Sequence, residues 1–229
     1  MTKQALIVFD IDGTLFQTEL VTTPAVQRTF AAYGLPVPDT ESIHATFGRP
    51  VEGYLAWLAS LCPPDQAQEI VDAVNRLELE LVGTEGQLYP GIREVLAQLK
   101  HEGHVLAICS NGPTDYVDTF LDAHDVRCFF DIIRTRGTVY GGKEDMFREI
   151  LRLIPVRPAI VIGDRNDDIA AAHANGALAI AARYGFGSEE EVEEADAHVH
   201  KPSDIPASVA ALIRNVTCGI FSDSPPSQQ

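Results

Sequence analysis

The segment Ala5-Leu6-Ile7-Val8-Phe9-Asp10-Ile11-Asp12-Gly13-Thr14-Leu15-Phe16 decides the fold. Its first five residues form a continuous apolar run, which predicts a buried strand with two carboxylates just beyond its end. Residues i and i+2 of a strand point the same way, so Asp10 and Asp12 can address one small space while Gly13 lets the chain turn. Two carboxylates this close are costly unless a metal, a positive neighbour or a proton lies between them. The segment therefore predicts chemistry at the carboxyl end of a strand.

Strand-like and helix-like segments alternate from residue 89 onward. The expected strands cover residues 105–109, 131–135, 159–162 and 178–181, and the expected helices cover residues 92–101, 114–123, 143–153 and 168–174. Such alternation is typical of βαβ units. We therefore expect an α/β fold, a doubly wound parallel sheet with helices on both faces.

Residues 17–88 show only the helical spacing of apolar residues and contain no strand-like run. They separate the first strand from the rest of the sheet, so we interpret them as an inserted, all-helical cap. The expected catalytic core then consists of residues 1–16 and 89–217. The polar, proline-containing tail of residues 218–229 is expected to be disordered.

Composition and charge exclude several classes of function. The chain has 229 residues, and its net charge of −16 with only four lysines argues against nucleic acid as a partner, because neutralising phosphates needs a basic surface. No apolar run approaches membrane-spanning length and no signal sequence is recognised, so we expect a cytoplasmic protein with no membrane partner. An anionic substrate would need a local positive site.

Chemistry-bearing residues follow each of four predicted strands. They are Asp10 and Asp12, then Ser110-Asn111-Gly112, then Gly141-Gly142-Lys143, and finally Gly163-Asp164-Arg165-Asn166-Asp167-Asp168. Open parallel sheets bind ligands outside the carboxyl ends of their strands. We therefore expect several acids, one hydroxyl, one lysine and exposed backbone N–H groups to converge on one crevice.

The segments D-I-D-G-T, I-C-S-N-G, G-G-K and G-D-R-N-D-D-I resemble, in order and spacing, the four motifs of the haloacid dehalogenase-like hydrolase superfamily. The helical insert resembles that family's type-one cap, and residues 185–191 (GFGSEEE) resemble phosphoglycolate phosphatase-like members. The resemblance extends to about residue 199. It implies a Mg²⁺-dependent phosphatase of small phosphorylated metabolites, with phosphoglycolate as the first candidate. A sugar-phosphate mutase or a pyrophosphatase of the same superfamily is the alternative.

Physical chemistry and the resemblance together suggest a role for each site residue. Asp10 is expected to attack phosphorus and form an aspartyl-phosphate, while Asp12 protonates the leaving alkoxide and later takes a proton from water. The expected Mg²⁺ ligands are Asp10, Asp164 and the backbone carbonyl of Asp12, and Asp168 is expected to steady Lys143. The expected phosphate-binding residues are Gly13, Ser110, Asn111 and Lys143.

Two arginines need separate expectations. Gly48-Arg49-Pro50 is typical of a loop tip, where an arginine could clamp a carboxylate or a second phosphate of the substrate, or could simply be exposed. Arg49 is therefore our first cap candidate for substrate contact. Further cap candidates are His44, Arg28 and Tyr54. Arg165 stands where the family more often has a small residue; it could reach the substrate or a partner subunit, but we expect it to face solvent, as most arginines do.

Two alternatives from other functional classes stay open on the residues alone. Residues 137–143 (GTVYGGK) fit the G-x-x-x-x-G-K spacing of a P-loop nucleotide-binding protein, although Glu144 stands where that loop needs a Ser or Thr hydroxyl for Mg²⁺. A chain with this fold could also be a binding module that does not catalyse. The intact set of acids, serine and lysine disfavours that alternative.

Overall fold

The computed structural model describes residues 4–48, 50–137 and 141–219. Within these residues, six parallel strands form one sheet in the order β3-β2-β1-β4-β5-β6. The strands are β1 (Leu6–Phe9), β2 (Val105–Pro113), β3 (Ile132–Arg136), β4 (Ala159–Gly163), β5 (Leu178–Ala182) and β6 (Ala197–Val199). This topology confirms the predicted α/β fold.

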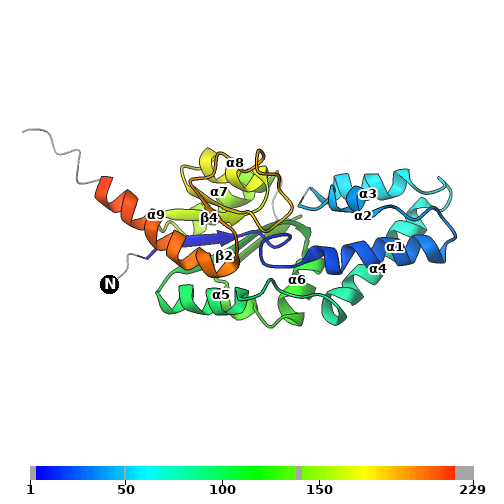
Figure 1. Ribbon diagram of the computed structural model, residues 1–229, viewed down its shortest axis with the longest axis horizontal. Coiled ribbons are helices and arrows are strands. Elements are labelled where there is room, and N and C mark those ends of the chain that lie inside the picture. Colours follow the sequence, from blue (N-terminus) through cyan, green and yellow to red (C-terminus); the bar gives the residue numbers. More distant parts are fainter. Residues whose placement is uncertain (1–3, 49, 138–140, 220–229) are drawn as a thin grey trace, which may run out of the picture.

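Helices of the core cover both faces of the sheet (Figure 1). They are α5 (Ile92–His101), α6 (Thr114–Ala123), α7 (Lys143–Leu153), α8 (Asn166–Ala174) and α9 (Ile205–Gly219), with the short 3₁₀ turns η2 (Arg127–Phe129) and η3 (Pro202–Asp204). The side chains of β1 alternate between the two faces. Ile7 and Phe9 pack in the same cluster as α5, α6 and α9, whereas Leu6 and Val8 pack with α7 and α8. Burial on both faces explains why β1 is apolar throughout.

The predicted cap contains η1 (Thr18–Leu20), α1 (Thr22–Ala32), α2 (Thr40–His44), α3 (Val51–Ser60) and α4 (Ala67–Thr84). These helices lie together beyond the end of the sheet to which β1 points (Figure 1). The two chain segments that join them to the core run side by side. Gln17 donates its backbone N–H to the Gln87 carbonyl at 2.9 Å, and Tyr89 donates to the Leu15 carbonyl at 3.0 Å. The cap is therefore attached by one paired double linker.

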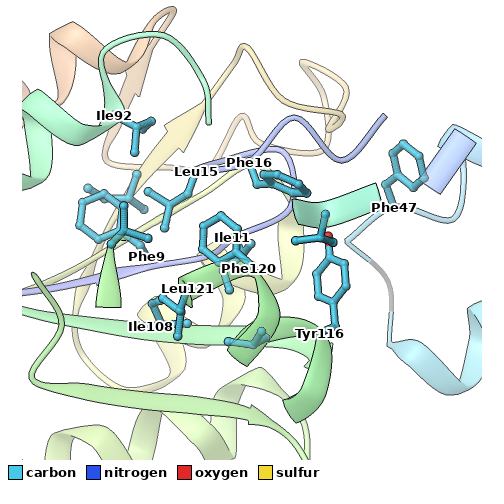
Figure 2. Packing of buried hydrophobic residues seen from close by; sticks show 14 of the residues in the cluster. Phe9, Ile11, Leu15, Phe16, Phe47, Ile92, Ile108, Tyr116, Phe120 and Leu121 are labelled. Carbon is cyan, nitrogen blue, oxygen red and sulfur yellow. The ribbon is translucent and has the colours of Figure 1, made fainter. Parts of the chain in front are cut away.

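The loop after β1 is anchored by aromatic packing. Figure 2 shows Ile11, Phe16 and Phe120 within the buried cluster, and the rings of Phe16 and Phe120 meet edge to face with centroids 5.2 Å apart. Because Phe120 belongs to α6, the loop that carries the two aspartates is fixed against that helix. An edge-to-face pair of this kind contributes about 0.5–1.5 kcal/mol beyond the burial of its area.

A strand and a helix near the carboxyl terminus were not predicted. Strand β6 has only three residues and includes His198, so it lacks an apolar run. Helix α9 has a recognisable signal, because Ile205, Val209, Leu212 and Ile213 follow helical spacing and are buried. The helix extends to Gly219, so residues 218 and 219, which we assigned to the tail, are helical. Residues 220–229 lie outside the described residues. Across the described ranges, every helix is too short or too polar to cross a bilayer.

Candidate active site

The turn after β1 brings its two aspartates to the edge of the sheet. Asp10 is 2% exposed, and its backbone N–H donates to the Ile162 carbonyl of β4 at 2.9 Å. Gly13 has a φ of +74°, and a Cβ atom added to it would lie 2.3 Å from Oδ2 of Asp164. Only glycine therefore allows this close approach of the first and fourth predicted motifs.

Lys143, the first residue of α7, joins two buried carboxylates. Its Nζ atom lies 2.9 Å from Oδ2 of Asp10 and 2.7 Å from Oδ1 of Asp168, and all three side chains are at most 3% exposed. Burial by itself lowers the pKa of this lysine, but the charges of Asp10 and Asp168 outweigh it and raise the pKa above its ordinary value. Lys143 is thus held as a cation at the carboxyl edge of the sheet.

Asp164 completes a cluster of three buried carboxylates. One oxygen each from Asp10, Asp164 and Asp168 lies within 4.8 Å of the other two. Burial raises the pKa of Asp164 well above its ordinary value, and the charges of Asp10 and Asp168 raise it further. Burial likewise raises the pKa of Asp10, against the opposing charge of Lys143, and that of Asp168 to about 7.

This donor set suits a divalent cation. Three ionised carboxylates beside one ammonium leave two negative charges, which a divalent cation would balance. Carboxylate oxygens are also the ligands that Mg²⁺ prefers. The arrangement could therefore hold a hard divalent cation on Asp10 and Asp164, while Asp168 is engaged by Lys143.

Asp12 occupies a different environment from Asp10. Its Oδ1 atom accepts hydrogen bonds from Thr18 Oγ1 at 2.7 Å and from the Tyr116 hydroxyl at 2.8 Å. Loss of solvent raises its pKa, and these two donors oppose the rise. A carboxyl group with a raised pKa, held by two donors, is suited to giving and taking a proton. Sequence reasoning did not find Thr18 or Tyr116, since neither belongs to a motif segment.

The second motif belongs to the sheet itself. We expected Ser110-Asn111-Gly112 to follow a strand that ends at Cys109, but β2 extends to Pro113, with its register against β3 shifting between Ser110 and Pro113. Ser110 is fully buried, and its Oγ accepts the Gly112 N–H at 3.0 Å. Irregularities of this kind interrupt strand pairing and re-aim side chains, and they are frequent next to active sites.

Comparison with known proteins identifies the family. Residues 7–182 match the model of the haloacid dehalogenase-like hydrolases. The chain belongs to this family. It is 30% identical over 219 residues to a 5'-nucleotidase of Pseudomonas aeruginosa, covering 90% of this chain and 92% of that protein. It is 29% identical over 220 residues to a phosphoglycolate phosphatase of Caulobacter vibrioides, covering 91% and 92%.

A solved structure supports the same assignment. The crystal structure of a CbbY mutant from Rhodobacter sphaeroides, in complex with xylulose-(1,5)bisphosphate, superposes with a TM-score of 0.73 at 27% identity, covering 87% of this chain and 95% of that one. The protein is thus a haloacid dehalogenase-like phosphatase. Family membership decides against the P-loop alternative, and Lys143 is correspondingly engaged by two aspartates.

Arg165 contradicts our expectation that it faces solvent. Its side chain is only 14% exposed, and its Nε atom pairs with Glu191 at 3.0 Å. A Cβ atom on Gly48, whose φ is +71°, would lie 2.6 Å from the Arg165 Cγ atom. Asn111 meets the same glycine, because its side-chain amide donates to the Gly48 carbonyl at 3.1 Å. In this haloacid dehalogenase-like phosphatase, Gly48 is therefore where the cap meets strand β2 and the residue before α8 of the core.

The other cap candidates have different surroundings. Tyr54 lines a cavity of about 280 Å³ between the cap and the core, which Asp12 and Asn111 also line. His44 forms a hydrogen bond with Thr23 and packs against aromatic rings, and Arg28 pairs with Glu85 at the surface. Neither residue is among the described residues that line the cavity. Arg49 lies outside the described residues. Sequence reasoning missed Glu78, another lining residue, because a glutamate on an amphipathic helix carries no signal of its own.

Proposed function

We propose that this phosphatase hydrolyses small phosphate monoesters through an aspartyl-phosphate on Asp10, with Mg²⁺ as its metal. The observation that carries the proposal is the buried ion-paired set in which Lys143 contacts both Asp10 and Asp168, beside Asp164. Moving ionised side chains out of water costs free energy unless good partners compensate them. A buried set of this kind therefore indicates a functional role. A bound phosphoryl group and a divalent cation would complete the set.

The two aspartates of the first turn divide the reaction between them. The carboxylate of Asp10 attacks phosphorus while the bond from phosphorus to the leaving oxygen breaks, and Asp12 gives its proton to that oxygen. Water then attacks phosphorus, Asp12 takes a proton from that water, and the bond to Asp10 breaks to release inorganic phosphate. The position of Asp12 supports this division, because Asp12 lines the cavity under the cap, where a leaving group has room.

The remaining residues bind and orient. We assign Lys143, Ser110 and the backbone N–H groups of Gly13 and Asn111 to the phosphoryl oxygens, which concentrates positive charge where negative charge develops. Mg²⁺, when bound, would offset the charge of the phosphoryl group and of the attacking carboxylate. The residues assigned to hold it are Asp10, Asp164 and, through its backbone carbonyl, Asp12. Asp168 positions Lys143.

The cap excludes water from the reaction. We assign residues 17–88 to the cap and residues 1–16 and 89–217 to the core, joined by the paired linkers near Gln17 and Tyr89. A cap on a narrow double linker can close over the crevice and open for product release. This geometry favours a hydrolase that admits substrate to an enclosed site.

Small phosphorylated metabolites are the proposed substrates. The named relatives act on phosphoglycolate and on nucleotides, so phosphoglycolate and nucleoside monophosphates are the first esters to compare. Contact between Arg49 and the substrate stays a prediction, which Arg49→Ala would test through KM. A mutase is distinguished from a hydrolase by the product, because a hydrolase releases inorganic phosphate.

The proposal is tested by Mg²⁺-dependent hydrolysis of an aryl phosphate. We expect turnover with Mg²⁺, none after chelation, and none with Asp10→Asn, a substitution that preserves size but removes the nucleophile. Glu80→Asn, an exposed position on α4, serves as the control and should leave turnover unchanged. Full turnover by Asp10→Asn would refute the covalent route, and full turnover without any divalent cation would refute the metal assignment.

A further inference from the structure

The cavity beneath the cap is acidic. Its volume is about 280 Å³, close to the lower end of the range for small-molecule sites, about 300–1,000 Å³. Three acids line it: Asp12 and Asp115 from the core, and Glu78 from α4 of the cap. Among its described lining residues there is no lysine, arginine or histidine. A leaving group in this space therefore meets acidic side chains from both the core and the cap.

Three described cations outside the cavity lining are already paired. Lys143 contacts Asp10 and Asp168. Arg165 pairs with Glu191, and Arg136 pairs with Glu52 of α3 at 3.1 Å. Among these three described cations, a second anionic group on a substrate would have to take one from its carboxylate; Arg49, next to the lining residue Gly48, lies outside the described residues. A leaving group that carries a carboxylate or a second phosphate is thus disfavoured by charge.

Two buried polar atoms that line the cavity lack hydrogen-bond partners among the described residues. The buried Oδ1 atom of Asn111 and the buried hydroxyl of Tyr54 have no hydrogen-bond partner in the described part of the protein, and both residues line the cavity. The Oε1 atom of Glu78 accepts a hydrogen bond from Thr22 Oγ1, so this carboxylate is held in place on the cap side. A buried polar atom without a partner destabilises the free protein, and a ligand that donates hydrogen bonds to it would remove that cost.

We propose that the cavity selects phosphate monoesters whose leaving group carries hydrogen-bond donors and no negative charge, such as an amino alcohol or a polyhydroxy compound. Glu78, Asn111 and Tyr54 are the residues that recognise these donors. The inference rests on the proposed phosphatase function and names its substrate class. A site built to accept hydrogen bonds from a substrate rejects analogues that cannot supply them.

Three esters with the same two-carbon skeleton test the selection. They are phosphoethanolamine, 2-hydroxyethyl phosphate and phosphoglycolate, whose far ends are a cation, a neutral hydroxyl and an anion. We would measure kcat/KM for each at about pH 8, where Glu78, whose pKa burial raises to about 7, is ionised. Any ester that turns over slowly would be measured as an inhibitor of aryl phosphate hydrolysis, which reports its binding.

The expected order is phosphoethanolamine first, 2-hydroxyethyl phosphate second and phosphoglycolate last, with about tenfold or more between the first and the last. Glu78→Gln keeps the size of the side chain but removes its charge, so it should lower that ratio several-fold. Glu80→Gln, at an exposed position on the same helix, should leave the ratio unchanged. A melting temperature of Glu78→Gln equal to or above that of Glu80→Gln at the assay pH would exclude misfolding.

Each contrary outcome has a distinct meaning. If phosphoglycolate is the best of the three esters, or if Glu78→Gln leaves the ratio unchanged, the selection is refuted while the phosphatase function stands. If none of the three esters is hydrolysed or inhibits, although the aryl phosphate is hydrolysed, the selection is also refuted. If neither the esters nor the aryl phosphate is hydrolysed in the presence of Mg²⁺, the proposed function itself fails.

Discussion

Lys143→Met removes the cation from the buried carboxylate cluster and keeps a side chain of similar length. In the wild-type protein Nζ lies 2.9 Å from Asp10 and 2.7 Å from Asp168, and both carboxylates are buried. The variant must either leave these carboxylates ionised without a partner or bind protons. Removing one member of a buried ion pair costs about 3–5 kcal/mol. This is a large share of the free energy of unfolding of a typical protein, about 5–15 kcal/mol.

The assay is urea unfolding of the metal-free protein at about pH 8 and about pH 5. With a slope of about 2–3 kcal/mol per molar urea, the midpoint should fall by roughly 1–2 M at the higher pH. Without Lys143 the pKa values of Asp10 and Asp168 rise further, because its charge lowers both. A carboxyl group whose pKa is raised in the folded state makes the folded protein less stable as pH rises. The difference in stability between wild type and Lys143→Met should therefore shrink at the lower pH.

Lys100→Met is the matched control. Lys100 Nζ lies 2.8 Å from Asp131 Oδ2, a distance like those in the buried cluster, but its side chain is 32% exposed and that of Asp131 is 42% exposed. Solvent screens such a pair, and its loss should cost no more than about 1 kcal/mol. If the two variants unfold at the same urea concentration at pH 8, burial of the Lys143 cluster has been given too much weight.

Four further perturbations test other parts of the account. The stability of Glu78→Gln relative to wild type, measured by thermal unfolding, should rise by about 1–3 kcal/mol from about pH 4.5 to about pH 8, because the folded-state pKa of Glu78 is raised from 4.5 to about 7. Parallel pH profiles of stability for the two proteins would contradict this. Tyr116→Phe removes one of the donors to Asp12, a bond worth about 1.5–3 kcal/mol, and should lower kcat roughly tenfold or more with KM little changed; an unchanged kcat argues against it. Gly48→Ala, at a positive φ and in contact with the core, should raise KM in steady-state kinetics by hindering cap closure, and an unchanged KM would contradict this. Asp164→Asn should abolish the rise in melting temperature that Mg²⁺ gives wild type, whereas a retained rise would place the metal elsewhere.

The approach of the motif residues to one another could be predicted because each motif lies at or beyond the carboxyl end of a strand of the sheet. Buried parallel strands must end at one edge, so residues after β1 and β4 meet there wherever the helices pack. The approach of Asp10 and Asp164 was predicted in this way, and the structure brings both together, with Lys143 from the start of α7 in contact with Asp10. The fold class followed from the same alternation of strands and helices. Short β6 was missed because three residues at a sheet edge carry little apolar signal.

The contacts between cap and core could not be predicted. Arg165 is shielded from solvent by Gly48 and Glu191, residues far from it in sequence, so the general tendency of arginines to be exposed misled the prediction. Glu78 and Tyr116 face the site only because of how α4 and α6 pack, and helical spacing does not distinguish a polar residue at a cavity from one in solvent. We propose that substrate specificity depends on these contacts, so the sequence indicates the reaction more clearly than the substrate.

The most direct test of the central claim is to trap the phosphorylated enzyme. The protein would be mixed with the ester it hydrolyses fastest and with Mg²⁺, quenched in acid during turnover, and reduced with borohydride, which converts an aspartyl-phosphate into homoserine. Mass spectrometry of the peptides should then find homoserine at position 10 and unmodified aspartate at position 12. Modification at any other residue, or an unmodified Asp10 in every sample quenched during turnover, would contradict the claim that Asp10 is the nucleophile.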